Sequence, residues 1–274
     1  MPSAHSRVLP GFALSLGTTI FYLSLIVLIP LSFAFLQTAT LSWDQFWSTV
    51  WNERARSAYA LTFGASLAAA SANAVIGFLI AWVFVRYDFP FKRVFDALID
   101  LPFALPTAVA GLVYASLYAP NGWYGQYLVP VGVEGAYSRL GIVLVLIFTG
   151  LPFVVRTLQP VLENLDAEME EASASLGASR WQTFRWVIFP ALTPALLTGF
   201  ALAFARSLGE YGSVIFIAGN IRFQTEIAPV LIVEKLDEFS YSEATALAVV
   251  LLVFSFLLLG IINLLQRWSK AHGN

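Results

Sequence analysis

The sequence predicts an all-α integral membrane protein with six transmembrane helices, built as a single domain over residues 1–274. Hydrophobic residues make up 58% of the chain, charged residues make up only 12%, and the mean hydropathy is +0.75. Soluble domains carry about 25% charged residues. Long apolar runs also recur along the chain, and a helix needs about 20 apolar residues to cross the hydrocarbon core. Composition and run length therefore both indicate a polytopic membrane protein.

Six apolar runs set the order of the predicted spans. They cover residues 12–36, 58–85, 96–118, 139–158, 191–218 and 243–266. The first run is longer than the apolar segment of a signal peptide, and no convincing small-residue cleavage site follows it. We therefore expect the first run to be an uncleaved membrane anchor.

The third predicted span carries Pro102 and Pro106. Each proline removes a backbone N–H donor and disfavours helix in the residue before it, so both should kink or interrupt the span. Broken membrane helices often mark transport sites, which makes both prolines candidates for the pathway. Asp100 precedes the break, and we expect it to cap a helix at the cytoplasmic interface.

Lys and Arg are unevenly divided between the two sets of loops. The richer set contains Arg7, Arg86, Lys92, Arg93, Arg156, Arg180, Arg185, Arg267 and Lys270, and the poorer set contains Arg54, Arg56, Arg139, Arg222 and Lys235. Positive residues favour the cytoplasmic side, so both termini and residues 159–190 are expected there. On the outer side, residues 225–239 predict a short amphipathic helix, with Glu226 and Glu234 on its polar face.

Composition also excludes several functions. The chain has no cysteine and a net charge of −2, and its two histidines lie near the termini. Disulfides, thiolate metal sites and histidine-based catalytic centres are therefore not expected, and no basic surface favours nucleic acid. No Gly-x-x-x-x-Gly-Lys-Ser/Thr loop is present to cradle ATP phosphates. An ATP-driven function would therefore require partner subunits that hydrolyse the ATP.

The cytoplasmic segment 162–190 has clear signals for two short helices. Asp166 can cap the first helix, and Gly177 can end it in a left-handed conformation. Ser179 and Gln182 fit a capping box that starts the second helix. An apolar stripe recurs at helical spacing along the first helix: Leu165, Met169, Ala172 and Leu176.

Small residues surround the turn between these helices, and Pro190 marks the start of the fifth span. Small side chains let a second backbone approach closely, which is typical of an element that seats in a groove on a partner. The same pattern is also typical of an amphipathic helix lying on the membrane surface. Spacing alone does not decide between these two interpretations.

The motif in this segment resembles the EAA loop of ABC importer permeases. Glu171, Ala172 and Ser173 stand three residues before Gly177, and nine further residues lead to the Val-Ile-Phe-Pro sequence that ends at Pro190. The family pattern has Ala at the position of Ser173, and Ile and Leu in the last element where this chain has Val and Phe. The resemblance implies a coupling helix pair that sits in a cleft of an ATP-binding subunit, with contacts through Glu171, Ala172 and Gly177.

Four further stretches resemble the T-type permease of bacterial sulfate/thiosulfate importers. They are residues 8–19 (VLPGFALSLGTT), 99–112 (IDLPFALPTAVAGL), 152–163 (PFVVRTLQPVLE) and 206–220 (RSLGEYGSVIFIAGN). The resemblance implies a type I, molybdate/sulfate-like fold in the bacterial inner membrane, surrounded by lipid. It also implies a second homologous permease in a heterodimer, two ATP-binding subunits that use Mg-ATP, and a periplasmic sulfate/thiosulfate-binding protein. The chain itself is expected to hold no cofactor and to catalyse no reaction. Molybdate permeases share the Leu-Pro and Gly-Glu-aromatic-Gly elements, so molybdate or another oxyanion is an alternative substrate.

Arg206 and Glu210 are charged residues inside the fifth predicted span, four residues apart. Such residues are costly in a membrane and usually face protein or water, and this spacing lets them meet on one helix face. In one interpretation the pair is a gate or pathway element: Arg206 offers positive charge to a passing anion, and Glu210 holds Arg206 or sets its orientation. In the other, the two form a structural ion pair between helices.

Two other classes of protein would fit six membrane spans. A secondary transporter or channel needs no ATPase and often shows an inverted repeat, which is not seen in this sequence. A membrane enzyme needs a catalytic constellation, and the residue inventory argues against one.

Overall fold

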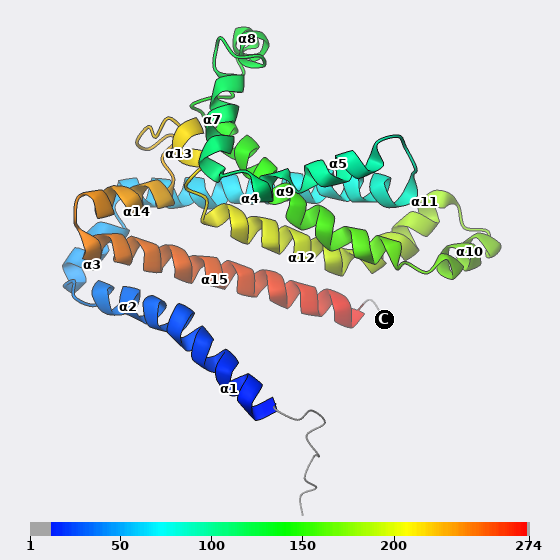
Figure 1. Cartoon of the computed structure of the whole chain (residues 1–274), viewed down its shortest axis with the longest axis horizontal. Coiled ribbons are helices and arrows are strands. Elements are labelled where there is room, and N and C mark those ends of the chain that lie inside the picture. The colour runs from blue at the N-terminus through cyan, green and yellow to red at the C-terminus, as the bar shows by residue number, and fades with distance from the viewer. Residues whose placement is uncertain (1–11, 273–274) are drawn as a thin grey trace, which may run out of the picture.

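A computed structural model describes residues 12–272 of the chain, and all regular structure in that range is helical (Figure 1). Four long helices run side by side: α4 (Glu53–Arg86), α9 (Arg139–Glu163), α12 (Phe189–Leu208) and α15 (Tyr241–His272). Helices α4, α9 and α12 all pack on one another, and α15 packs against α12.

Five helical stretches in the described part of the chain are long and apolar enough to cross a membrane. They are Leu14–Thr38, Glu53–Arg86, Arg139–Glu163, Arg180–Leu208 and Tyr241–Leu264. These stretches match the first, second, fourth, fifth and sixth predicted spans. The first consists of α1 (Phe12–Leu23), the π-helical turn η1 (Ser24–Leu28) and α2 (Ile29–Thr38), and α2 packs against α15.

The third predicted span is divided into three helices, as its prolines predict. They are α5 (Lys92–Ile99), α6 (Leu101–Ala104) and α7 (Thr107–Tyr118). Pro102 lies in the first turn of α6, where a helix does not need its N–H, and Leu105 before Pro106 is extended. Figure 1 shows α5 near the bundle and α7 projecting away from it.

The fifth predicted span ends earlier than expected. Helix α12 stops at Leu208, and a turn at Gly209 leads to the short helix α13 (Val214–Ile217). The prediction of one helix to residue 218 is therefore wrong. The Glu210 side chain accepts hydrogen bonds from Ser213, which gives the backbone an alternative to continued helix.

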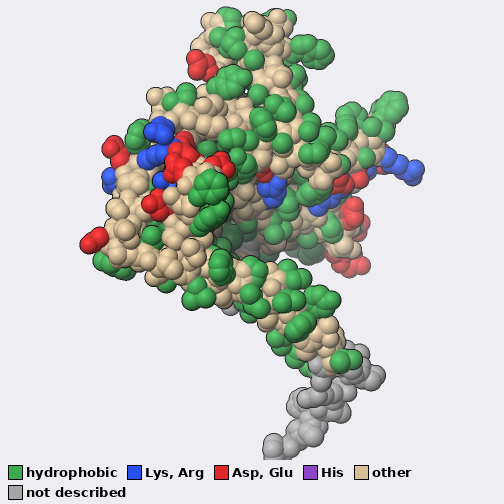
Figure 2. All heavy atoms as spheres, turned by 60° about the vertical axis from the view of Figure 1, so that its left-hand side comes forward, with side chains coloured by type: hydrophobic (Ala, Val, Ile, Leu, Met, Phe, Trp, Pro, Cys, Tyr) green, Lys and Arg blue, Asp and Glu red, His purple; other side chains and the backbone are tan. Residues whose placement is uncertain are grey.

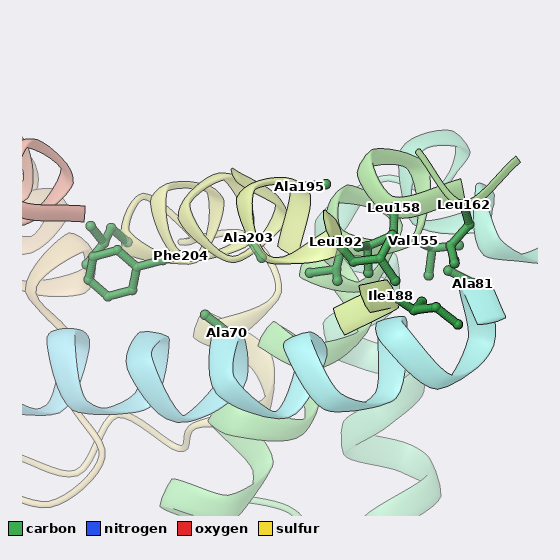
Figure 3. Packing of buried hydrophobic residues seen from close by; sticks show 12 residues of the cluster. Ala70, Ala81, Val155, Leu158, Leu162, Ile188, Leu192, Ala195, Ala203 and Phe204 are labelled. Atoms are coloured by element: carbon green, nitrogen blue, oxygen red, sulfur yellow. The ribbon is translucent and has the colours of Figure 1, made fainter. Parts of the chain in front are cut away.

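Small residues allow the three core helices to approach closely. Val154 of α9 lies between Gly77 of α4 and Gly199 of α12, and a Cβ on Gly77 would lie 2.7 Å from Cγ1 of Val154. A Cβ on Gly199 would lie 2.9 Å from the Cα of Val154. Without a strong hydrophobic driving force in lipid, such close packing is a main source of helix association. Figure 3 shows the larger side chains of this core, including Leu158 and Leu192, in the gaps between the helices.

The two ends of the bundle carry different elements. Helices α10 (Ala167–Ser175) and α11 (Arg180–Thr183) lie at one end, and α3 (Trp43–Val50) and α14 (Ala228–Asp237) lie at the other (Figure 1). This separation agrees with the assignment of the two segments to opposite membrane faces. Arg7, which contributed to the orientation prediction, lies outside the described residues.

Loops and short helices complete the chain. Helix α8 (Gly125–Leu128) and the 3-10 turn η2 (Val129–Val131) follow α7, and the π-helical turn η3 (Phe184–Ile188) joins α11 to α12. Helix α14 confirms the short helix predicted in residues 225–239.

Candidate functional site

The helix caps and the turn predicted within residues 162–190, the segment that carries the EAA-like motif, are all present. Asp166 caps α10 by accepting the N–H of Glu168 at 3.0 Å, and Gly177 leaves the helix at a φ of +83°. Ser179 and Gln182 form a capping box, with each side chain bonded to the other residue's backbone N–H at 3.3 and 2.7 Å. The backbone course of this segment is therefore determined locally.

Residues of the EAA-like motif take two different positions. Glu171, Ala172 and Gly177 are exposed, whereas Ser173 is half-buried and its hydroxyl pairs with that of Thr183 at 2.9 Å. Ser173 thus ties α10 to α11 rather than facing outward. Substitution of Ser for the Ala of the family pattern adds this internal hydrogen bond.

Exposed apolar side chains surround the motif. Leu176 is 89% exposed, and Met169 and Trp181 are also exposed. The stripe predicted along α10 therefore leaves most of its apolar surface uncovered by this chain, with Leu165 packed against the core as the exception. Large apolar side chains that gather exposed in one segment are typical of a protein or membrane interaction site.

Pro190 is exposed and lies in the first turn of α12, as predicted for the start of the fifth span. The turn before it is π-helical, because the N–H of Phe189 bonds to the carbonyl of Phe184 five residues earlier. Pro190 has no N–H to continue the hydrogen-bond ladder. Helix α11, η3 and α12 consequently form one helical stretch, Arg180–Leu208, with a wide turn at Phe184–Ile188.

Arg206, in the last turn of α12, and Glu210, just beyond the end of that helix, form an ion pair with 2.5 Å between Nη1 and Oε2. Glu210 is 2% exposed, and its Oε1 accepts the N–H and the hydroxyl of Ser213, both at 2.9 Å. Arg206 is 34% exposed. The carboxylate is thus fixed by protein, while the guanidinium retains access to the surface of this chain.

The interruption after α12 meets the interruption before α7. A Cβ on Gly212 would overlap Oγ1 of Thr107, and a Cβ on Gly111 would overlap the carbonyl of Ser213. Pro106, immediately before Thr107, is therefore brought close to the turn that holds Glu210. Pro102 lies elsewhere, along an apolar groove lined by α4, α5 and α9. Gly111 and Gly212 are the features of the sequence that allow this contact, but neither glycine by itself predicts which two segments pack together.

A second charged cluster joins α5 to α9. Arg156 donates Nε–H and Nη2–H to the carboxylate of Asp100 at 2.8 and 2.6 Å, and Nη1–H to Asp96 at 2.7 Å. The side chain of Asp100 makes no capping hydrogen bond, so the prediction that it caps a helix is wrong. The Asp100 carboxylate accepts two hydrogen bonds from the Arg156 guanidinium and none from the backbone N–H groups at the start of α6.

A third charged cluster lies at the opposite end of the bundle. Arg54 donates Nε–H and Nη2–H to Glu226 at 2.8 and 2.6 Å, and it also pairs with Glu234 of α14. Glu226 is 4% exposed, so its predicted place on a solvated helix face is wrong. Hydrogen bonds from Arg54 lower the pKa of Glu234 below its usual value. Arg54 thereby connects the start of α4 to the loop that carries Glu226 and to α14.

Taken together, these features define a multi-pass membrane protein with an exposed two-helix elbow, formed by α10 and α11, and two helix interruptions that pack against each other. The sequence model for "Binding-protein-dependent transport system inner membrane component" matches residues 73–271. The chain belongs to this family of ABC importer permeases.

Curated relatives are similar along almost the whole chain. The sulfate transport system permease protein CysT of Salmonella typhimurium is 53% identical, covering 95% of this chain and 94% of the relative. The protein of the same name from Escherichia coli is 52% identical over the same shares. That from Synechocystis sp. is 51% identical, covering 93% of this chain and 90% of the relative.

Solved structures share the fold at low sequence identity. A bacterial ABC transporter involved in the import of alginate aligns with a TM-score of 0.77 at 16% identity, covering 93% of this chain and 94% of that chain. A bacterial alginate ABC transporter in complex with its alginate-bound periplasmic protein aligns with a TM-score of 0.74 at 18% identity and 94% of both chains. The predicted ABC importer permease fold is thereby confirmed.

Proposed function

We propose that this chain is the T-type permease subunit of an ATP-driven importer of sulfate and thiosulfate. The observation that carries the proposal is the 53% identity, across 95% of the chain, to a sulfate transport system permease. Solute passes between helices without covalent chemistry on it.

The proposed complex contains a second homologous permease in a heterodimer, two ATP-binding subunits and a periplasmic sulfate/thiosulfate-binding protein. Mg-ATP is used by the ATP-binding subunits, and both termini of this chain face the cytoplasm. Support comes from the exposed coupling elbow, with Leu176 at its tip. A fold relative was also solved with its periplasmic partner. Lipid and the second permease cover the apolar surfaces of α1 and α7.

The elbow carries the mechanical step of this proposal. Closure of the ATP-binding subunits moves α10 and α11 through Glu171, Ala172 and Gly177. Because α11, η3 and α12 form one helical stretch, Arg180–Leu208, movement of the elbow reaches Arg206 at the far end of that stretch.

Arg206 is the proposed pathway residue for the anion. Glu210 orients Arg206, because the Glu210 carboxylate is buried and held by Ser213, while the Arg206 guanidinium is partly accessible. A structural ion pair is the alternative role. Arg206→Glu places two carboxylates together. Unchanged uptake and basal ATPase activity of this variant in a fully assembled complex would rule out the pathway role of Arg206.

Radiolabelled sulfate uptake tests the substrate. A strain without this subunit, and without redundant sulfate uptake, is measured with and without the restored gene, and with excess thiosulfate or molybdate as competitor. Restored uptake that thiosulfate suppresses and molybdate leaves intact is expected. Suppression by molybdate instead would indicate the molybdate alternative, and absence of a sulfate deficit would move the substrate to another solute.

A further inference from the structure

An aromatic cluster centred on Phe184 connects the coupling elbow to the core helix α4. The ring of Phe184 stacks on Trp181 of α11 with centroids 5.6 Å apart, and meets Trp82 of α4 edge-on at 5.6 Å. It also contacts Phe78 of α4 at 6.1 Å and Phe189 of α12 at 5.9 Å. One side chain therefore touches three helical elements: the elbow, α4 and the start of the fifth span.

The other arm of the elbow is held by the same end of α4. The guanidinium carbon of Arg86 lies 5.1 Å from the centroid of the Trp82 ring, and Arg86 also pairs with Glu170 of α10. Both members of that ion pair are partly exposed, and such pairs contribute little by themselves. Aromatic pairs add to burial, so the rings are the stronger part of the attachment.

The backbone hydrogen-bond register of the helical stretch changes at Phe184. Phe184 begins the π-helical turn η3, which has a wider hydrogen-bond register, and Pro190 contributes no N–H. Single π-helical turns within α-helices are frequent at functional sites. Because the helical ladder changes register between the elbow and α12, side-chain contacts must contribute to holding the two parts together.

We propose that Phe184 is the positioning residue that makes the elbow and α4 move as one unit when the ATP-binding subunits close. The inference rests on the proposed function, because it assigns Phe184 a place in the ATP-driven cycle. Loss of the ring should leave the exposed docking surface intact. It should also let the elbow move without carrying α4 and the pathway with it.

Trp186 supplies a matched control on the same π-helical turn. It is also aromatic, but it is 71% exposed and lies beside the guanidinium of Arg185 rather than against α4. Phe184→Ala and Trp186→Ala thus each remove an aromatic side chain from the same turn, one packed inward and the other, larger one exposed. Phe184→Tyr restores the inward ring, and Phe184→Leu retains apolar volume without it.

The experiment uses the full complex in proteoliposomes with its loaded binding protein. Sulfate taken up per ATP hydrolysed is expected to fall about tenfold in Phe184→Ala, the factor expected for loss of one strong aromatic pair. Retention of the ATP-binding subunits is expected in the same sample, with wild-type coupling in Phe184→Tyr and Trp186→Ala. Wild-type coupling in Phe184→Ala, or an equal loss in Trp186→Ala, would overturn the proposal. If Phe184→Ala does not assemble, Phe184→Leu decides by the same criteria.

A second readout is independent of the transported solute. The chain contains no cysteine, so spin labels can be placed by single substitutions at exposed Ala167, at the start of α10, and at exposed Val75 on α4. Wild-type complex should keep the distance between these labels when nucleotide is added, and the Phe184 variant should change it. A nucleotide-dependent change of the same size in wild type would overturn the proposal. Absence of sulfate uptake in wild type, with this distance result intact, would instead count against the substrate alone.

Discussion

The two ends of the helix bundle are built by different means. At the end that carries α3 and α14, which is the proposed outer end, Arg54 joins α4 to Glu226 and Glu234, so charged groups are paired within the chain. Figure 2 shows acidic and basic side chains gathered on this end, next to the hydrophobic surface of the first span. At the elbow end, aromatic rings attach α11 and η3 to α4, while Leu176 and most of Trp181 remain uncovered. One end completes its own contacts, and the other leaves contacts for a partner.

Removal of the Arg54 side chain should cause the largest loss of stability among the variants proposed. Arg54→Ala leaves the carboxylate of Glu226 buried without its partner, and loss of one member of a buried ion pair costs about 3–5 kcal/mol. Arg56→Ala is the matched control, because Arg56 is exposed on the same helix. Unfolding of the detergent-solubilised subunit measures both variants. Equal midpoints for Arg54→Ala and Arg56→Ala would contradict the importance of the cluster.

Charge clusters of this kind limit what the sequence could predict. Arg54 and Glu226 lie 172 residues apart, so no local pattern pairs them. Helical periodicity placed Glu226 on a polar face, and position before a break made Asp100 a helix cap. In each case a distant arginine provided a stronger partner. By contrast, Asp166 and Gly177 act on their own backbone neighbours, and their roles were predictable.

Contact between the two helix interruptions is the next feature to test. Gly111→Ala places a Cβ against the backbone carbonyl of Ser213, which cannot rotate away as a side chain could. We expect a loss of about 1–3 kcal/mol of stability from this overpacking, and reduced uptake because α7 and the turn must separate. Gly64→Ala is the control, since a Cβ there meets no atom within 4 Å. Wild-type uptake and stability in Gly111→Ala would show that the two interruptions are not packed together.

That contact also lay beyond sequence prediction. Pro102 and Pro106 correctly indicated an interrupted third span, because proline acts on its own helix. The predicted fifth span ran to residue 218, because the apolar run continues through α13 after the turn at Gly209. Apolar composition in a membrane protein therefore predicts burial in lipid or protein better than it predicts where a helix ends.

Leu176 sharpens the comparison at the elbow end. Leu176→Asp should change the stability of the isolated subunit by at most about 0.5 kcal/mol, as is usual for exposed positions. It should reduce capture of the ATP-binding subunits by about tenfold, because burial of the leucine on docking is lost. Capture by the tagged permease, beside the unfolding midpoint of the same preparation, measures the two effects. A lower midpoint with unchanged capture would place Leu176 in the fold rather than in the interface.

The smallest expected effect concerns pH at the outer end. Hydrogen bonds from Arg54 hold the pKa of Glu234 below its ordinary value of 4.5. A carboxyl with a lowered folded-state pKa stabilises the protein above the unfolded-state value, and this stability is lost as pH falls through the folded-state value. The unfolding midpoint of wild type should therefore fall more steeply below about pH 4.5 than that of Glu234→Gln. If the unfolding midpoints of wild type and Glu234→Gln fell in parallel below this pH, the Arg54–Glu234 pair would not contribute to stability.

ATPase association after removal of the elbow tests the central claim most directly. Residues 166–189 are replaced by a short Gly/Ser linker, and capture of the ATP-binding subunits is compared with that by wild type in the same membranes. We predict that the replaced chain still inserts with its partner permease but captures no ATP-binding subunit and supports no sulfate-stimulated ATP hydrolysis. Retained capture and retained stimulation would contradict the assignment of α10 and α11 as the coupling segment.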